Sequence, residues 1–567
     1  MKLTKNAQII LNRFLIKDET GKMIESPEEL LKRVAKNISK EDKRYRASDE
    51  EILKSENEFF EAMNNLEFLP NLPALANAGR KLQQLAACFT IPISDDTAGI
   101  FQAVKEMALI QKSGGGTGFN FSRLRPEGSQ VSETGGIASG PVSFMKVFDT
   151  ATGAIKEGGI RRGANMGILR IDHPDIEKFI TAKKAGELQN FNISVALTEE
   201  FMEAVLKNKD FKLRFGEKVF RIVKAKKLFS EIANYAWQNG DPGIIFIDEI
   251  NKHNPTPEIG IIEATNPCGE VPLLPYESCV LGSINLTKFI KNKKIDFKNL
   301  ERIIKIGVHF LDNTIDASSY PISQIEKIVK ANRKIGLGIM GFADVLILMK
   351  IPYDSKSAEK TAGRLMEFIE EKSREASQEL AEKRGSFPNI NKSIWKDKNI
   401  KMRNATVTAI APTGTIAILA NCSEGIEPLF SLVFNRHSTY GDLLEINPLF
   451  KEAVKKLRLK KQILDQISNE GSIQSKNLKI PMQIKKIFKT AHDITPDWHI
   501  HIQAAFQKHT DNAVSKTVNL KETATQEDVE KVFLNAYRLK LKGLTVYRYN
   551  SRAQQVLELC KTCSIKI

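Results

Sequence analysis

Hydrophobic and polar positions follow two different patterns along this chain. Up to about residue 70 the apolar positions recur at helical spacing, as in Asp49–Leu66. Ser26 and Pro27 mark the N-cap and the first residue of another helix. After a turn region rich in Pro, Gly and Asn, short apolar runs alternate with helical segments to about residue 545, which is typical of an α/β fold with a largely parallel sheet. The strand candidates include Leu85–Ile93, Gly243–Ile247, Gly336–Ala343 and Ala405–Ala411.

These patterns predict three parts: a helical domain at residues 1–70, an α/β domain at 71–551 and a short polar tail at 552–567. The 567 residues are 42% hydrophobic and 27% charged, which is ordinary for a globular protein. No apolar run approaches the ~18 residues of a membrane helix, and the first residues lack a signal-peptide pattern. We therefore expect a cytoplasmic protein that does not associate with membranes.

The net charge of +16 permits anionic partners. The lysines, however, are interleaved with acidic and apolar residues, which favours a solvated lysine-rich surface over nucleic-acid binding. We expect no nucleic-acid partner, whereas anionic nucleotides would suit this charge. Six cysteines in so long a chain do not form a disulfide scaffold, so redox or metal chemistry is the better interpretation.

The stretch Glu263–Leu286 carries the clearest chemical signal, and its centre reads Asn-Pro-Cys-Gly-Glu. The proline and the glycine predict a tight loop rather than a helix. In an extended loop alternate residues point the same way, so Asn266, Cys268 and Glu270 would converge on one small substrate. Glu270 could then act as a base, Asn266 could orient a hydroxyl and Cys268 could supply sulfur chemistry.

Three other segments carry weaker signals. The glycine cluster Ser113–Asn120 could let backbone N–H groups approach a phosphate or a sugar, although a plain tight turn explains it equally well. Ala411–Ile416 is either a strand-to-helix anion site or a simple Thr N-cap. Cys560 and Cys563 form a Cys-x-x-Cys pair that suits a mobile dithiol, since no second pair completes a metal site; we expect no metal ligands in this chain. Taken alone, Cys88 and Cys279 read as core cysteines and Asp95 as a turn residue.

Together these segments resemble the ribonucleotide reductases. Asn-Pro-Cys-Gly-Glu is similar to the active-site loop of that family, and the resemblance extends from about Leu11 to about Gln555. Gly135–Asp149, Thr510–Leu520 and the TVYR at 545–548 look like the adenosylcobalamin-dependent (class II) enzymes. The resemblance implies a ten-stranded α/β barrel with the loop inside it and a helical domain before it.

The resemblance also implies an activity: reduction of ribonucleotides, expected as diphosphates, to 2′-deoxyribonucleotides by a thiyl-radical mechanism that supplies DNA precursors. Adenosylcobalamin would be the cofactor. The catalytic residues implied are Asn266, Cys268 and Glu270, with Cys268 carrying the radical. Cys88 and Cys279 look like the redox pair that becomes a disulfide, and Cys560 and Cys563 look like the tail dithiol that reduces it.

Nucleotide contacts are implied in two places. The substrate-binding residues implied are Ala87, Cys88, Gly116, Asn266, Pro412, Thr413, Gly414, Thr415 and Ile416. Asp95 would contact the deoxyribose of an effector nucleotide and Arg125 its phosphates. Two positions depart from the family pattern: Leu72 stands where relatives usually have Ser or Thr beside a substrate phosphate, and Ser132 stands where some have Arg near the effector.

The expected partners are the nucleotide substrate and effector, a thioredoxin-like or other dithiol reductant, and a second copy in a homodimer. Asp172-His173-Pro174 does not fit a cobalamin-binding Asp-x-His-x-x-Gly motif, so no such histidine ligand is expected. One alternative is a metal-dependent class I large subunit that needs a separate radical-generating subunit; such a subunit should have adjacent tyrosines, whereas Arg548 separates Tyr547 and Tyr549 here. A non-catalytic nucleotide-binding regulator is the other, although binding alone needs no set of thiols. Cys422 matches no redox position.

Overall fold

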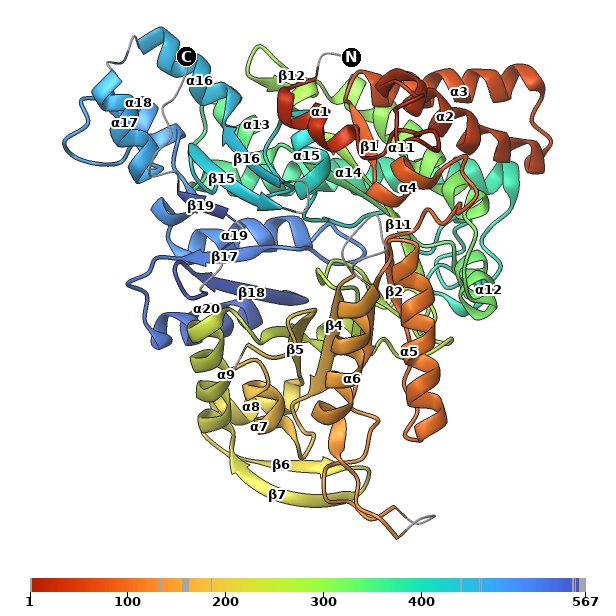
Figure 1. Cartoon of the computed structure of the whole chain (residues 1–567), viewed down its shortest axis with the longest axis vertical. Coiled ribbons are helices and arrows are strands. Elements are labelled where there is room, and N and C mark those ends of the chain that lie inside the picture. The colour runs from red at the N-terminus through yellow and green to blue at the C-terminus, as the bar shows by residue number, and fades with distance from the viewer. Residues whose placement is uncertain are drawn as a thin grey trace.

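A computed structural model describes residues 3–131, 135–155, 163–184, 186–438, 441–457, 459, 461–552, 555 and 557–559 of the chain. Helices gather at its N-terminal end, and a large sheet surrounded by helices forms the rest (Figure 1). The described helices contain no segment that is both long and apolar enough to cross a membrane.

The N-terminal helices begin where the sequence predicts at Pro27 and Asp49, whereas the helix at Leu72–Asn77 forms inside the stretch predicted as a turn region, because Asn71 caps it. They are α1 (Lys5–Leu11), α2 (Pro27–Ser39), α3 (Asp49–Asn64) and α4 (Leu72–Asn77), with a 3₁₀ turn, η1 (Lys40–Tyr45), between α2 and α3. The Ser26 side chain accepts the Glu29 N–H while the Glu29 carboxylate accepts the Ser26 N–H, so two donors at the start of α2 are satisfied at once. Ser48 caps α3 in the same way.

The main sheet has ten strands in the order β1-β11-β2-β3-β4-β5-β8-β18-β17, with β14 paired to β11. Their bounds are β1 (Phe68–Pro70), β2 (Cys88–Thr90), β3 (Gly116–Asn120), β4 (Asn165–Arg170), β5 (Phe191–Leu197), β8 (Gly243–Phe246), β11 (Ser278–Asn285), β14 (Ile335–Met340), β17 (Thr517–Leu520) and β18 (Gly543–Arg548). β2, β3, β4, β5 and β8 run parallel to one another. The β18–β17 and β11–β14 pairs are also parallel, but β8–β18 and β11–β2 are antiparallel.

Backbone bridges close this sheet into a barrel. Leu337 of β14 bridges Thr408, and Ile410 bridges Val514, three residues before β17; both bridges are parallel. The pairings therefore return from β17 through residues 408–410 to β14 and β11. The result is two five-stranded parallel halves that meet antiparallel at both seams, with β1 added outside the ring. The expected ten-stranded α/β barrel is confirmed. The apolar run 405–411 contributes a bridging segment, and the run at 85–93 a strand of three residues.

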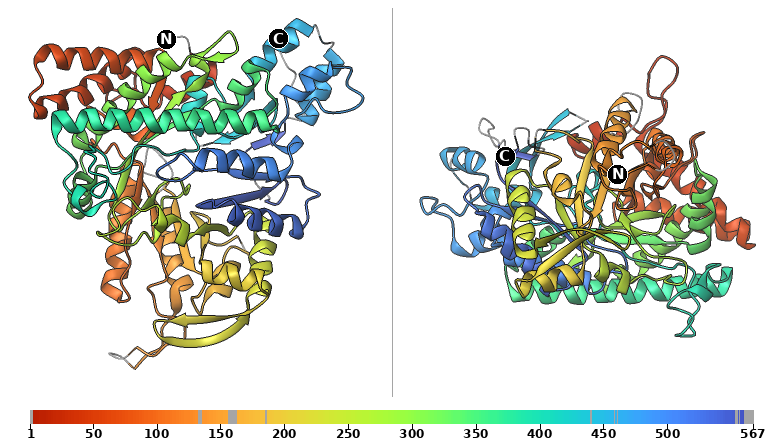
Figure 2. Two further views of the ribbon diagram at one scale, coloured as in Figure 1. Left: turned by 180° about the vertical axis from the view of Figure 1, so that it is seen from behind. Right: turned by 90° about the horizontal axis from the view of Figure 1, so that it is seen from below.

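The helices that follow α4 surround the large sheet or lie beside it (Figure 1). They are α5 (Thr97–Lys112), α6 (Gly140–Ile155), α7 (Ile176–Thr181), α8 (Glu199–Leu206), α9 (Ala225–Asn239), α10 (Ile247–Lys252), α11 (Phe297–Ala317), α12 (Ser323–Asn332), α13 (Phe342–Met349), α14 (Lys356–Arg384), α15 (Gly414–Ala420), α16 (Pro448–Leu457), α17 (Lys461–Glu470), α18 (Met482–Ile487), α19 (Pro496–Gln507) and α20 (Gln526–Arg538). α14 has 29 residues and runs across the back of the molecule (Figure 2).

Several small sheets lie outside the main sheet. The hairpin of β6 (Asp210–Phe215) and β7 (Lys218–Lys224) lies at the end farthest from the N-terminal helices (Figure 1). β12 (Ile290–Lys291) pairs with β13 (Lys294–Ile295). β15 (Val433–Ser438) lies between β16 (Gly441–Ile446) and β19 (Leu557–Leu559), so the last described residues of the chain form an edge strand.

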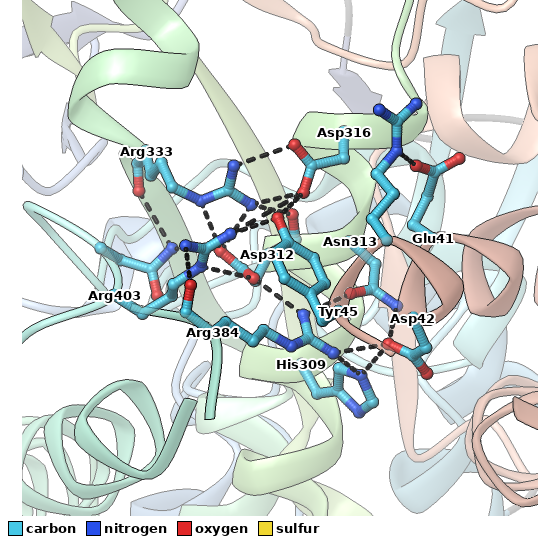
Figure 3. Close-up of polar contacts among 12 residues, drawn as sticks. Glu41, Asp42, Tyr45, His309, Asp312, Asn313, Asp316, Arg333, Arg384 and Arg403 are labelled. Atoms are coloured by element: carbon cyan, nitrogen blue, oxygen red, sulfur yellow. Dashed lines mark hydrogen bonds and ion pairs between the residues drawn. The ribbon is translucent and has the colours of Figure 1, made fainter. Parts of the chain in front are cut away.

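The helical region and the barrel share one hydrophobic core. A buried charge cluster also joins them (Figure 3). At its centre Asp312 of α11, fully buried, accepts hydrogen bonds from Arg333, Arg384 and Arg403 at 2.9–3.1 Å. The same arginines reach the N-terminal region, because Arg384 contacts Asp42 of η1 at 2.5 Å and Arg403 contacts Tyr45. Breaking one member of such a cluster leaves uncompensated buried charge.

Acid should weaken this cluster, and Asp42 allows the effect to be measured. Burial alone would raise the pKa of Asp42, but hydrogen bonds from His309 and Asn313 and the charge of Arg384 lower it from 3.8 to about 2. Because the folded-state pKa lies below the unfolded value, this contribution is complete above about pH 4 and is lost as pH falls through about 2.

We therefore expect Asp42→Asn to remove about 2 kcal/mol of the acid-induced loss in free energy of unfolding between pH 5 and pH 2. Denaturant unfolding as a function of pH checks this. Glu28→Gln is the control, since Glu28 pairs with Lys32 with both side chains 56% exposed. Parallel pH profiles for wild type and Asp42→Asn would contradict the expectation.

Candidate active site

The predicted loop is the tip of a hairpin that crosses the barrel strands. β9 (Ala264–Thr265) pairs antiparallel with β10 (Pro272–Leu273), and residues 266–271 connect them. The Asn266 N–H donates to the Val271 carbonyl at 3.2 Å, and the Gly269 N–H donates to the Asn266 carbonyl at 3.0 Å. Gly269 has a φ of +79°, which only glycine adopts without strain. The tight loop is confirmed.

The extended form of this loop, with alternate side chains on one side, is wrong. The turn closes on itself, so Asn266 and Glu270 are 2% and 3% exposed while Cys268 is exposed at the tip. The Asn266 carboxamide accepts the Val271 N–H at 3.0 Å and donates to the Cys88 sulfur at 3.2 Å. The Glu270 carbonyl accepts the Ala513 N–H at 2.8 Å, which joins the hairpin to the segment that closes the barrel.

Two glycines of β3 let the hairpin lie against the sheet. A Cβ at Gly118 would lie 1.8 Å from the Thr265 carbonyl oxygen, and a Cβ at Gly116 would lie 2.9 Å from the Pro267 ring. No side chain fits in either place. Within the glycine cluster Ser113–Asn120, the part that belongs to β3 makes room for the hairpin. The plain tight-turn interpretation applies only to the part before β3 begins.

Cys88 and Cys279 face each other across two strands. They are register partners in the antiparallel β2–β11 pair, and both are thiols, 4% and 0% exposed. Antiparallel partners have Cα atoms about 4.5–5.5 Å apart, within the span of a disulfide. Their surroundings are a small apolar cluster of Ala87, Val271, Leu273, Leu281 and Ala409. Burial raises the pKa of the Cys279 thiol.

A cavity of about 830 Å³ reaches the exposed thiol of Cys268. Its wall combines strand residues of β5, β8 and β18 with the segment after α15 and with residues 4–6 at the N-terminus. Of the residues predicted for the site, Cys268 and Pro412 line this cavity. Cys422, which matches no redox position of the family, also lines it and is half-buried.

The segment 411–416 forms a left-handed turn into α15. Thr413 occupies the N-cap position with a φ of +61°, but its hydroxyl accepts the Gly425 N–H at 2.8 Å and does not cap its own helix. The simple N-cap interpretation is therefore wrong. Pro412, Gly414 and Thr415 are half-buried. Ile416 packs its side chain into the core, so only its backbone could meet a ligand.

The two predicted effector residues lie together. Arg125 Nε contacts an Asp95 carboxylate oxygen at 2.7 Å, and the Arg125 N–H donates to the other at 3.0 Å. About a third of each side chain remains exposed. Both residues follow the ends of neighbouring parallel strands, β2 and β3.

Other predicted positions have plainer surroundings. His173 is 2% exposed, and its ring nitrogens meet the Leu124 carbonyl at 2.9 Å and the Asp175 N–H at 3.0 Å, so this histidine is structural. Leu72 is the first residue of α4, which Asn71 caps. Ser132, Cys560 and Cys563 lie outside the described residues.

Sequence reasoning missed a buried ion pair next to the cysteines. Glu277 and Lys334 are each 1% exposed and lie 2.6 Å apart. The position of Glu277, two residues before Cys279, was the one sequence feature that could have drawn attention to it. Its partner Lys334 is 57 residues away in sequence, and residue spacing cannot reveal such a pair.

This fold is that of a ribonucleotide reductase large subunit. The solved structure of the Actinobacillus ureae class Id ribonucleotide reductase alpha subunit is similar over 97% of each chain, with a TM-score of 0.79 at 23% identity. The family's barrel-domain profile matches residues 86–401 and 397–547, and its all-alpha domain profile matches residues 1–83. The chain belongs to the ribonucleotide reductase family, as its motifs implied.

Two relatives cover nearly all of this sequence. The vitamin B12-dependent ribonucleoside-diphosphate reductase of Thermoplasma acidophilum is 46% identical, over 98% of this chain and 80% of its own length. The protein of the same name from Mycobacterium tuberculosis is 44% identical, over 98% of this chain and 81% of its own length.

The close approach of the Thr265 carbonyl to Gly118 gives a direct test of this geometry. Gly118→Ala should displace the hairpin, because the added Cβ meets a backbone oxygen that cannot move alone. We expect a lower melting temperature and loss of most activity. Gly363→Ala is the matched control: a Cβ there has no neighbour within 4 Å inside α14, so stability should stay equal or rise by about 0.5–1 kcal/mol. A Gly118→Ala protein with wild-type melting and turnover would contradict the close approach.

Proposed function

We propose that this chain reduces ribonucleoside diphosphates to 2′-deoxyribonucleotides by a thiyl-radical mechanism, with adenosylcobalamin as its cofactor. Two relatives that cover nearly all of the chain are named vitamin B12-dependent ribonucleoside-diphosphate reductases, which supports the substrate class and the type of cofactor. The observation that carries the proposal is the cysteine arrangement: Cys88 and Cys279 face each other beside Asn266, directly beneath a hairpin whose tip presents Cys268. Nucleotide binding alone would not need it.

Each side chain has a defined task in this reaction. Cys268, as a thiyl, takes the 3′-hydrogen of the ribose and returns it at the end. Glu270 takes the proton of the 3′-hydroxyl, and Asn266 hydrogen-bonds the ribose. Cys88 and Cys279 protonate the leaving 2′-hydroxyl, which departs as water, and their two electrons reduce the sugar while a disulfide forms between them. Ribonucleotide and dithiol thus become deoxyribonucleotide, disulfide and water.

The cavity that reaches Cys268 is open and large, and adenosylcobalamin would bind at it. Its volume of about 830 Å³ lies at the upper end of small-molecule sites, and its lining mixes apolar side chains with hydroxyls and amides. Ser194, Asn421, Ser423 and Thr545 would hold adenosylcobalamin there. Its described lining contains no histidine. When bound, the cofactor supplies the radical that Cys268 carries.

The phosphates of the substrate are assigned to the turn at 412–416. Thr413 at its start has a left-handed backbone conformation, and Gly414 and Thr415 are half-buried. Backbone N–H groups at the beginning of α15 would therefore be available to an anion. Pro412 of this turn and Cys268 line the same cavity, which supports one continuous substrate site. Ala87 and Gly116 border the buried cysteines and the hairpin, respectively, and would contact the substrate there.

The effector nucleotide is assigned to Asp95 and Arg125. Their ion pair, with both side chains partly exposed, brings a carboxylate for a sugar hydroxyl and a guanidinium for phosphate to one place. A homodimer is proposed with it. α5 exposes Phe101 and Leu109 at 52% and 40%, two large apolar side chains eight residues apart on one helix, which a second copy could cover. The proposed location is the cytoplasm.

The tail dithiol Cys560 and Cys563 is proposed to reset the Cys88–Cys279 disulfide and to be reduced in turn by a thioredoxin-like protein. β19 supports this role. It pairs with β15 through Phe434 and Arg436, and these two residues and Leu557 line the cavity that reaches Cys268. Residue 560 follows β19 directly.

A metal-dependent class I large subunit is the less favoured alternative. The names of the relatives at 44–46% identity point to cobalamin instead. Tyr547 contacts Gln555 at 3.3 Å, whereas the Tyr549 ring lies 5.2 Å from that of His492, so the two tyrosines do not form a stacked pair. A non-catalytic regulator is disfavoured because it would have no use for the buried thiols.

The first test is nucleotide reduction by the purified chain with a dithiol, with and without adenosylcobalamin. We expect turnover only with the cofactor, and Cys268→Ala should lower it by at least about 10³-fold while nucleotide affinity stays close to wild type. Turnover that needs a second protein and no cobalamin would instead support the class I alternative. Residual turnover of Cys268→Ala near wild type would sink the radical assignment.

The tail makes a second prediction. Cys560→Ser with Cys563→Ser should abolish turnover driven by a thioredoxin-like protein but leave most turnover driven by dithiothreitol, because a small dithiol can diffuse to the buried disulfide. Thr562→Ala, which keeps both thiols, is the control. Full activity of the double variant with the protein reductant would remove the tail from the electron path.

A further inference from the structure

Glu277 and Lys334 form a completely buried ion pair beside the cysteines. Glu277 lies directly before β11, two residues from Cys279, and Lys334 lies directly before β14. β11 and β14 are parallel, with Val280 opposite Ile335, so continuing this register by one residue places Lys334 level with Cys279. The Lys334 ammonium and the Glu277 carboxylate are 2.6 Å apart, and each side chain is 1% exposed.

The Glu277 carboxylate connects three segments that meet behind the cysteines. One oxygen accepts the Leu274 N–H at 2.7 Å, at the end of the active-site hairpin, and also meets Lys334. The other accepts the Asn332 carboxamide at 2.5 Å. The backbone adds a fourth connection, because the Glu277 carbonyl accepts the Thr90 N–H of β2 at 3.1 Å. Thr90 stands two residues after Cys88, just as Glu277 stands two before Cys279.

The segment that contains Lys334 is also held in place by the Asp312 cluster. Arg333, which lies between Asn332 and Lys334, turns the opposite way with a φ of +48° and enters the Asp312 cluster (Figure 3). Three consecutive residues thus reach two buried acidic groups, Glu277 on one side and Asp312 on the other. This arrangement gives Lys334 little freedom to move away from β11.

The ammonium also matters for charge at sulfur. Burial raises the pKa of Cys279, and among its neighbours Lys334 opposes that rise, whereas Glu277 and Glu270 add to it. A thiolate on Cys279 would therefore have one nearby compensating cation. Cys88 is 4% exposed as a residue and Cys279 0%, and the Cys88 sulfur faces Asn266 of the hairpin, so we take Cys88 as the sulfur that an incoming thiol attacks.

We propose that Glu277 and Lys334 are positioning residues for the redox pair: the Glu277 carboxylate joins β11 to the end of the hairpin and to residues 332–334, its backbone carbonyl holds β2, and the ammonium stabilises Cys279 as the leaving thiolate when the disulfide is reduced. The inference rests on the proposed redox role of Cys88 and Cys279. It deepens that role by assigning the direction of attack.

Reduction of the Cys88–Cys279 bond is a thiol–disulfide exchange. A thiolate of the reducing dithiol attacks the Cys88 sulfur, the Cys88–Cys279 bond breaks, and Cys279 leaves as a thiolate that then takes a proton. The second thiol of the dithiol displaces Cys88, which also takes a proton. Two electrons pass from the dithiol to the protein, and the dithiol becomes a disulfide.

The test needs neither cofactor nor turnover. The full chain is oxidised with diamide, the Cys88–Cys279 disulfide is identified by peptide mass mapping, and its reduction by dithiothreitol is timed. Lys334→Met combined with Glu277→Gln removes both charges together, so no unpaired charge is left buried. We expect reduction about three- to tenfold slower, because the variant lacks both the ammonium level with Cys279 and the carboxylate that joins β11 to the hairpin and to residues 332–334. The equilibrium with dithiothreitol at pH 7 should stay unchanged, since both cysteines end as thiols.

Arg33→Met with Glu25→Gln is the matched control, a similarly buried ion pair in the helical region with side chains 13% and 7% exposed. Its disulfide should be reduced at the wild-type rate. A Lys334→Met/Glu277→Gln rate within twofold of wild type, or an equal slowing in the control, would overturn the positioning role. Failure of wild type to form a Cys88–Cys279 disulfide is a separate result, which would overturn the proposed redox pair itself and this inference with it.

Discussion

The contact on which the rest of the site depends is the close approach of a hairpin backbone to a strand backbone. The Thr265 carbonyl lies where a Cβ of Gly118 would be, so the hairpin can enter the barrel only because β3 has no side chain there. That approach places the cysteine tip at the cavity and buries Asn266 and Glu270 beside the paired thiols. A side chain at one strand position would separate these groups, whatever their own identity.

The second constraint is electrostatic. Burying charge is costly unless every charge has a partner, and Asp312 with its three arginines meets that condition while joining α11, α14 and the N-terminal region. Arg333 belongs to this cluster, and its neighbours in sequence hold Glu277 behind Cys279. The packing of the helical region on the barrel and the geometry of the redox pair thus depend on one short segment, 332–334.

Local patterns predicted much of this molecule because the interactions involved are local. The Ser26 cap, the helix at 49–64 and the alternation of an α/β fold follow from neighbours in sequence. The closed barrel, the site residues and the cysteine pairing came instead from resemblance to a family. Two predictions of local conformation were wrong. The 266–270 loop is not extended, because its own hydrogen bonds close the turn. The Thr413 side chain caps no helix, because its hydroxyl accepts the Gly425 N–H. The Glu277–Lys334 pair gave no signal, since its partners meet only after β11 and β14 pair.

The antiparallel seams of the barrel have a consequence for its ligands. In parallel sheets, ligands gather at the carboxyl ends of strands. Because the two halves run in opposite directions, their carboxyl ends lie at opposite mouths of the barrel. Asp95 and Arg125 follow strands of one half, whereas the turn at 412–416 follows the bridging segment of the other. The opposite strand directions of the two halves therefore keep the two proposed nucleotide sites apart. The substrate and the effector, which are both nucleotides, need not compete for the same end of the barrel.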